Sequence, residues 1–564
     1  MTNTNISNAL TRNRTLARLA IGSALTGTLA IMLVVMPSPV AAADECGVAP
    51  LTPGTVTCTP AGNPYPNGIS YIAPPADLTI VLQDGVRVDT SGSLNIGLLA
   101  VGDSALTVNG ATNTLITTTD NGAFGALVAN NTDPLSVTLD RIVTSGANAT
   151  GVLASSSEGA VTVNTNNITT SGLRAEGISA STDTSAITVR SGAITTGGID
   201  ATGINANSDF GDIAITSNSI RTTGDGSGGF FNTGATGILA QTGGIGSVTV
   251  NSTAITTTGT NAIGIRAVNN TGALSVTSGT IATSGVNSDA INVRSAGTAT
   301  VNTGAITTTG ANANGVVATG ATGANVTFTS ISTTGANANG VLVPAGVMFF
   351  GPAASATATV NGGSVSTVGA TSDGVRAIAG TGTSAVNVTG NVSTQGANSR
   401  GIFASGPAGA IVTNGGTVST AGVTSNGVEA SSTTGPVVVT VNNVSTTGNG
   451  SRAVVATATA GAATVTVNGA LRTTGTTADV LTVNSGTNGT VNVGAAGSFA
   501  ATQGNFITLN STGTSTLNNA GTIGNNLGGF ALVATGGPIT INNSGTLSSD
   551  IVRSEERRVG KECW

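Results

Sequence analysis

Apolar and polar residues alternate in short runs along most of the chain. Pairs of aliphatic residues separated by one position occur at Val161/Val163, Ile187/Val189, Ile213/Ile215, Val248/Val250 and Val437/Val439. Alternation with a period of two is the pattern of a β-strand with one buried face. Gly, Asn, Ser and Thr, which favour turns, separate these runs. The pattern therefore predicts many short strands joined by tight turns.

The runs recur at a nearly constant spacing. Thirteen glycines each follow an Ile, Val or Leu by four positions: Gly146, Gly172, Gly198, Gly224, Gly259, Gly285, Gly310, Gly335, Gly369, Gly396, Gly422, Gly448 and Gly475. Ten of the twelve steps are 25 to 27 residues long, and the other two are 34 and 35. A second glycine often follows five residues later, directly before an aliphatic residue, as at Gly151 and Gly177. A fixed period of this length indicates a repeat architecture.

A strand of four or five residues cannot bury its apolar face alone, but stacked copies of one repeat pair each strand with its copies above and below. Each repeat contains three strand signals. We therefore predict an all-β, right-handed parallel β-helix over residues 91–552, with coils of about 26 residues. We expect the repeat glycines at corners where tight bends need a positive φ. Propeller, leucine-rich-repeat and tandem-sandwich folds fit less well, because aromatic signatures, leucines and longer units are scarce.

Residues 44–90 lack the repeat and are rich in proline. An open end of a β-helix exposes strand edges that invite pairing with other chains. We therefore predict that this segment is an N-terminal cap. It contains Cys46 and Cys58, which could close a short disulfide loop in an oxidising compartment. Two free thiols are the alternative.

The two stretched repeats each contain a phenylalanine pair, Phe230-Phe231 and Phe349-Phe350. Insertions in a solenoid map to loops that leave the rod. These loops are candidate contact sites, because exposed aromatic residues can mark interaction surfaces. The alternative is a flap that folds back over the rod.

The two ends of the chain differ from the repeats. Arg12, Arg14 and Arg18 precede a mostly apolar run over 19–35, and small residues follow it up to position 43. This order predicts a secretory signal peptide over 1–43, with a membrane anchor as the alternative. Residues 553–564 contain seven charged residues and the single Trp of the chain. They resemble the translation of a sequencing adapter, so we expect the natural protein to continue; a genuine charged tail is the alternative.

Composition limits the chemistry that the chain can perform. There is no His, only 7% of residues are charged, and 2% are aromatic. The lack of His removes Ser-His-Asp and Cys-His catalysis and His-ligated metal sites. The sparse Lys and Arg argue against a nucleic-acid partner. No phosphate-binding Walker loop is present, so we expect no cofactor and no enzymatic activity.

Few residues remain as chemical candidates. Glu176 and Asp200 form the only carboxylate pair worth testing for glycoside chemistry. Asp373 and Arg400 occupy the same position in neighbouring repeats, which predicts a charge pair of little worth at the surface. Runs such as Thr256–Thr258 and Thr307–Thr309 resemble the threonine rows of ice-binding solenoids, although threonine is also a good outward-facing strand residue.

The start of the predicted mature chain resembles autotransporter passenger proteins. The resemblance lies in Asp44-Glu-Cys46, in Cys58 to Ser70, in Asp77 to Leu82, and in the late Asn-Asn-x-Gly-Thr coils near 518 and 542. It implies secretion by a Gram-negative bacterium and outer-membrane passage through a C-terminal β-barrel of the same polypeptide. No run of barrel strands is present here, which the adapter-like end explains as truncation.

The resemblance implies a surface-displayed adhesin or structural rod. Its partners would be the outer-membrane translocation and assembly machinery, and then host, cell or matrix surfaces. The alternatives are a passenger for two-partner secretion, which has no barrel of its own, and a secreted β-helix that acts on polysaccharides.

Overall fold

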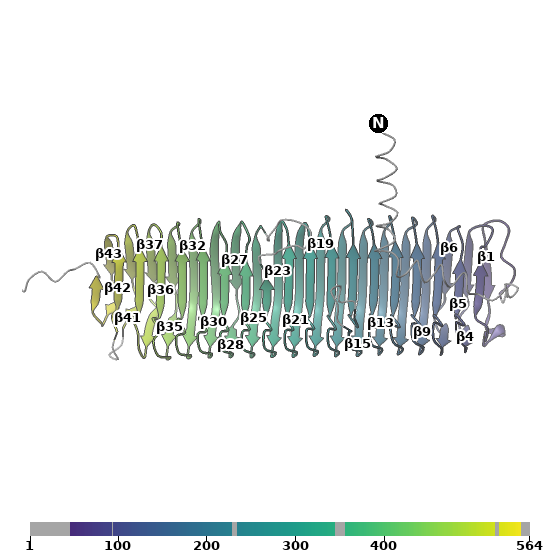
Figure 1. Cartoon of the computed structure of the whole chain (residues 1–564), viewed down its shortest axis with the longest axis horizontal. Helices are drawn as coiled ribbons and strands as arrows, with labels where there is room; N and C mark the ends of the chain where they lie inside the picture. The colour runs from purple at the N-terminus through teal and green to yellow at the C-terminus, as the bar shows by residue number, and fades with distance from the viewer. Residues whose placement is uncertain (1–45, 93, 228–233, 345–355, 525–528, 554–564) are drawn as a thin grey trace, which may run out of the picture.

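The computed structural model describes residues 46–92, 94–227, 234–344, 356–524 and 529–553. These residues form a parallel β-solenoid of about 18 turns with about 26 residues per turn (Figure 1). Because stacked parallel strands lie about 4.8 Å apart, 18 turns give a rod about 85 Å long. The prediction of an all-β, repetitive β-helix is confirmed.

Each turn contributes one short strand to the first of two rows. The short strands are β2 Ile69–Ile72, β5 Leu98–Val101, β8 Ala126–Asn130, β10 Val152–Ser156, β12 Ile178–Thr182, β14 Ile204–Ser208, β16 Ile238–Thr242, β18 Ile265–Asn269, β20 Ile291–Ser295, β22 Val316–Gly320, β24 Val341–Val343, β26 Val375–Ile378, β29 Ile402–Ser405, β31 Val428–Ser432, β33 Val454–Ala458, β36 Leu481–Ser485, β39 Ile507–Ser511, β42 Leu532–Gly536 and β45 Ile551–Arg553.

The second row consists of longer strands that bend once. The continuous ones are β9 Leu135–Thr144, β11 Val161–Thr170, β13 Ile187–Thr196, β15 Ile213–Thr222, β17 Val248–Thr257, β19 Leu274–Thr283, β21 Thr298–Thr308, β23 Gly323–Thr333, β25 Ala358–Thr367, β30 Gly409–Thr420 and β32 Val437–Thr446. At the bend of β11, Asn166 and Asn167 are both exposed, so the inward-outward alternation shifts there.

In other turns the long strand is divided in two. These pairs are β3 Leu78–Leu82 with β4 Arg87–Thr90, β6 Leu106–Gly110 with β7 Leu115–Thr118, β27 Thr383–Val388 with β28 Val392–Thr394, β34 Ala463–Val467 with β35 Ala470–Thr473, β37 Gly489–Val493 with β38 Ser498–Ala501, β40 Ser515–Asn519 with β41 Thr522–Ile523, and β43 Ile539–Asn543 with β44 Thr546–Leu547.

The solenoid begins inside the segment that the sequence assigns to a cap. Strand β1 (Gly54–Cys58) pairs in parallel with β3, and β2 pairs with β5. A single 3-10 turn, η1 (Pro60–Gly62), follows β1. A separate cap is therefore not confirmed. A disulfide joins Cys46 to Cys58 and so ties the start of the described chain to β1, with 4.7 Å between the two Cα atoms.

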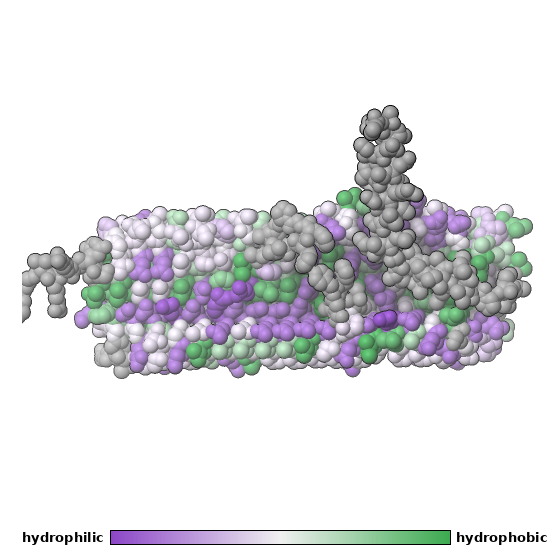
Figure 2. Space-filling view, viewed as in Figure 1, coloured by the Kyte–Doolittle hydropathy of each residue, from purple (hydrophilic) through white to green (hydrophobic). Residues whose placement is uncertain are grey.

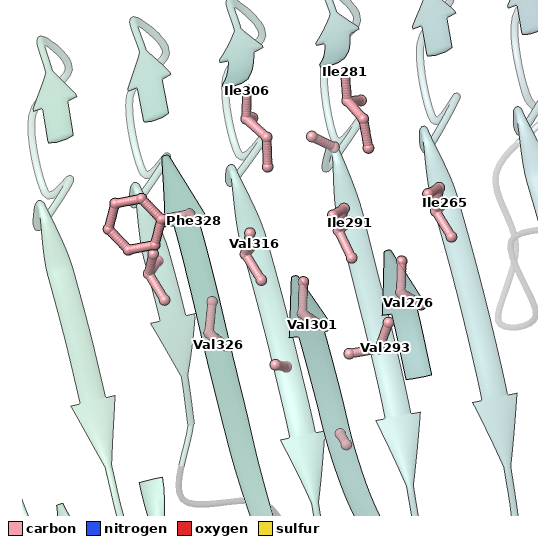
Figure 3. Packing of buried hydrophobic residues seen from close by; sticks show 14 of the residues in the cluster. Ile265, Val276, Ile281, Ile291, Val293, Val301, Ile306, Val316, Val326 and Phe328 are labelled. Atoms are coloured by element: carbon pink, nitrogen blue, oxygen red, sulfur yellow. The ribbon is translucent and has the colours of Figure 1, made fainter. Parts of the chain in front are cut away.

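The core is a set of aliphatic columns that run along the rod axis. In β18, β20 and β22, the first residues Ile265, Ile291 and Val316 stack on one another (Figure 3). All three are completely buried. A second, small apolar cluster around Leu127 and Leu153 lies on the opposite side of the short strands from this core. Ladders of identical side chains thus replace the mixed core of a globular domain.

The repeat glycines are required by close approach of neighbouring turns. A Cβ atom on Gly172 would overlap the carbonyl oxygen of Gly146, and one on Gly198 would overlap that of Gly172. The expectation of positive φ at these glycines is wrong, because the left-handed residue lies two positions later. Asn287 and Asn312 are examples, with φ of 56° and 55°. Asn tolerates this conformation better than most residues.

The threonine runs point alternately outward and inward. Thr308, in the middle of Thr307–Thr309, is buried, and its hydroxyl donates to the Ala313 carbonyl at 2.7 Å. The same bond across the turn recurs in most turns from Thr118 to Thr446. A preference for outward-facing strand positions therefore accounts only for the first and third threonine of each run. The middle threonine points into the rod, where its hydroxyl donates a hydrogen bond to a backbone carbonyl of the turn.

Candidate functional site

The predicted contact loops with Phe230, Phe231, Phe349 and Phe350 lie outside the described residues. The candidate sites described below therefore all lie on the repeating turns of the rod. Three features of these turns combine polarity with burial: a carboxyl at Glu176, a column of stacked polar side chains before the short strands, and a groove over the bend of the long strands.

Glu176 and Asp200, the predicted carboxylate pair, are held by different partners. Glu176 is half-buried, and burial raises the pKa of its carboxyl, while hydrogen bonds from Ser179 and Asn205 oppose the rise. Asp200 accepts the Ser227 N–H at 2.6 Å and lies 3.9 Å from Arg174. Burial thus favours the neutral form of the Glu176 carboxyl, whereas the Asp200 carboxylate is engaged by the Ser227 N–H and by Arg174.

A continuous polar column lies two residues before each short strand from β20 to β39. Its members are Asp289, Asn314, Asn339, Asp373, Arg400, Asn426, Arg452, Asp479 and Asn505. In most steps, the side-chain oxygen of one member accepts the backbone N–H of the next, as between Asn314 and Asn339 at 2.9 Å. These hydrogen bonds fix the register of the stacked turns, because each one joins residues that hold the same position in two neighbouring turns.

Charge enters the column at Asp289, around Arg400, and again at Arg452 and Asp479. Burial raises the pKa of the Asp289 carboxyl, although hydrogen bonds from Asn292 and Asn314 and the nearby Arg266 oppose the rise. The pKa of Arg266 is lowered, by burial and by the charge of Arg294. The buried carboxyl of Asp289 is thus hydrogen-bonded mainly by amide groups. The next two turns have the neutral residues Asn314 and Asn339 at the same position of the column.

The second charged place is a network around Arg400. This residue contacts Asp373 at 2.9 Å and Glu429 at 3.3 Å, and Arg376 contacts Asp373 at 3.3 Å. The guanidinium of Arg400 lies over the Phe403 ring, 3.7 Å from its centroid. The predicted pairing of Asp373 with Arg400 is confirmed. Its assignment to the surface is wrong, because the two side chains are only 5% and 19% exposed.

A groove of about 430 Å³ runs over the outward side of the bend in β9, β11, β13 and β15. Asp140, Asn166, Gly192 and Asn218 follow one another at the bend, and residues 110–112 close one end. Asp140 accepts the Asn166 amide at 2.7 Å and the Asn113 N–H at 2.9 Å. Bands of hydrophilic residues also run lengthwise along the face seen in Figure 2.

Buried hydroxyl groups without partners lie behind the groove, on the inward side of the same strands. Thr165 and Ser191 border the groove, each 7% exposed, and neither hydroxyl has a hydrogen-bond partner among the described residues. Ser217 and Ser252 continue the same row and are also unpartnered. A buried hydroxyl left unsatisfied costs about 1–3 kcal/mol. The row therefore has unused hydrogen-bonding capacity beneath the groove.

The sequence reasoning missed the polar column and the groove. The column carries a sequence signal, since a polar residue stands two positions before the strand in nine consecutive turns. The groove has a weaker signal: Thr or Ser replaces an aliphatic residue at the inward position before the bend. Only the register of the turns shows that these hydroxyls form one row.

Within the described ranges, no group of three or more Cys, Asp or Glu side chains could hold a metal ion. In the same part of the chain, no helix has the length and apolar character to cross a membrane. Comparison with models of protein families, with curated proteins and with solved structures gives no significant match.

Proposed function

We propose that this chain is the surface-displayed passenger of a Gram-negative autotransporter, with an adhesive or structural role. The observation that carries the proposal is the uninterrupted stack of about 18 turns, a rod about 85 Å long. Such a rod holds its outer turns away from an anchoring membrane. The signal-peptide-like residues 1–43 and the resemblance of residues 44–82 to passenger proteins support the secretory part.

The outer surface of the rod suits repeated, weak contacts. Between 246 and 549 the sequence has only ten charged residues, and the closest ion pairs among them are used within the Arg400 network. The remaining outward positions are mostly Thr, Ser and Asn, which offer the same donors and acceptors turn after turn. Many equivalent weak sites on one rod bind a surface far more tightly than any single site does.

The test is expression of the complete gene in a Gram-negative host that does not adhere. Antibody staining and protease digestion of intact cells would measure display, and retention on coated surfaces would measure adhesion. We expect both, and we expect deletion of residues 1–43 to abolish both. Rods that stay inside the cell when the full gene is present would contradict the proposal.

A two-partner passenger is distinguished by the 3′ end of the gene. Sequencing from source DNA shows whether the reading frame continues into a β-barrel, as we propose, or a separate gene encodes the transporter.

A polysaccharide-acting enzyme is the second candidate, favoured by the raised pKa of the Glu176 carboxyl. Such a group can act as a general acid when a second carboxyl lies opposite it. Release of reducing sugar that Glu176→Gln abolishes would favour this candidate over the adhesive one. We expect no release from either chain.

A further inference from the structure

The groove over the bend has the shape of a site for an extended chain. It crosses four consecutive long strands, β9, β11, β13 and β15, so its lining residues follow one another along the rod axis. Neighbouring turns repeat about every 4.8 Å. The rise per sugar of an extended β-1,4-linked glycan is slightly longer than this value, so the groove would hold roughly one sugar per turn, and the same sugar edge would recur at every second turn.

The groove lining selects for a neutral, hydroxyl-rich ligand. Thr138, Asn164, Asn166, Thr216 and Asn218 provide hydroxyl and amide groups, which both donate and accept hydrogen bonds. Sugar hydroxyls have the same double capacity.

The other ligand classes fit the groove less well. Arg190 is the only cation in the lining and Asp140 the only anion, so a polyanion would gain a single ion pair. An added peptide strand needs a free strand edge, whereas β11, β13 and β15 are each paired on both sides.

We propose that this groove binds a neutral, linear polysaccharide along the rod axis, a role that rests on the adhesive function proposed above. Binding to one groove is weak, because the groove is shallow and has no aromatic platform. We expect a dissociation constant on the order of 1 mM for a short oligosaccharide, and surface adhesion comes from many displayed rods.

Cellohexaose is the probe, and saturation-transfer NMR with titration of the full chain is the measurement. The groove variant is Asn164→Ala with Asn218→Ala. The control is Asn361→Ala with Asn442→Ala, since these residues hold the same positions in β25 and β32, outside the groove. We expect the groove variant to bind at least about tenfold more weakly than wild type. The control should be unchanged, and Thr216→Trp, which fills the groove, should also lose binding.

Three results would overturn the proposal: no binding by the wild type, equal losses in groove and control variants, or tighter binding of hexagalacturonate than of cellohexaose. The last result would assign the groove to an anionic glycan. Display and adhesion of cells are measured separately. Cells that adhere through rods unable to bind the probe would retain the proposed function and refute the groove, whereas probe binding by rods that never reach the surface would do the reverse.

Discussion

Two regions of the rod place their polarity in different parts of the turn. In the turns of β11 to β17, the inward position before the bend is Thr165, Ser191, Ser217 or Ser252, and these hydroxyls are unpartnered. In the turns of β32, β34 and β37, the same position is Val441, Val467 or Val493, all buried. The later region has its charges in the polar column instead, around Arg400.

The polar residues of the two regions therefore contribute differently to the stability of the rod and to its capacity to bind a ligand. A valine at the bend leaves no hydroxyl unsatisfied, whereas Thr165, Ser191, Ser217 and Ser252 each bury a hydroxyl that gains no hydrogen bond from the described residues. The charges around Arg400 in the later region are paired with one another and form a closed network, whereas the buried Nε of Arg452 has no partner among the described residues. We infer that the earlier turns sacrifice stability where the groove lies, and that the later turns serve mainly to hold the rod together.

The largest expected effect comes from breaking the closed network. Arg400→Ala removes the closer of the two cations that contact Asp373 and the ion-pair partner of Glu429, and leaves Arg376 as the remaining cation beside Asp373. Loss of one member of a buried pair costs about 3–5 kcal/mol, and we expect the lower end of this range because Arg376 remains. Urea unfolding followed by circular dichroism measures it, and Arg472→Ala, at an exposed position in β35, is the control. Equal stability of both variants would show that the network contributes nothing.

Exchanging the inward residues at the bend tests the comparison itself. Val441→Thr introduces into β32 the hydroxyl that β11 has at Thr165, and it should cost about 1–3 kcal/mol, because the new hydroxyl has no partner. The reciprocal Thr165→Val should leave the free energy of unfolding unchanged or increase it. A loss of stability in Thr165→Val would mean that this hydroxyl already has a structural partner, and the contrast between the two regions would then disappear.

The structural features that the sequence predicts are those that repeat in every turn. The 26-residue period and the alternation at Val161/Val163 predict the stacked strands, because every turn repeats them. The inward direction of Thr308 and the left-handed Asn287 were not predictable, since they depend on where the chain bends within each turn. The burial of the Asp373–Arg400 pair was missed for a related reason: Glu429, which contacts Arg400, comes from the next turn, and the contact of Arg400 with Phe403 depends on how the chain enters β29.

A smaller effect is expected from the threonine that closes each turn. In the later region the Thr446 hydroxyl donates to the Ser451 carbonyl at 2.8 Å, whereas Thr222, at the same position in the earlier region, has no partner among the described residues. Thr446→Val should therefore lower the free energy of unfolding by about 1 kcal/mol, the net value of one hydrogen bond. Thr222→Val should cost less than this, by the same urea measurement. Equal losses would show that the two hydroxyls have equivalent environments.

The smallest effect at neutral pH concerns the half-buried Glu176 carboxyl of the earlier region. Because burial raises the pKa of Glu176 above its ordinary value of 4.5, the folded chain binds more protons than the unfolded chain between these two pKa values. Stability should therefore fall as the pH rises through this window, and above it the full cost of the buried charge remains. Glu176→Gln keeps the shape of the side chain and removes the charge, so the variant should lose this contribution to the pH dependence and match or exceed wild type at pH 7.

Thermal unfolding from pH 4 to pH 8 measures the difference in stability between the wild type and Glu176→Gln. A difference that grows toward low pH instead would mean that the carboxylate is stabilised in the folded rod, and that Ser179 and Asn205 outweigh the effect of burial.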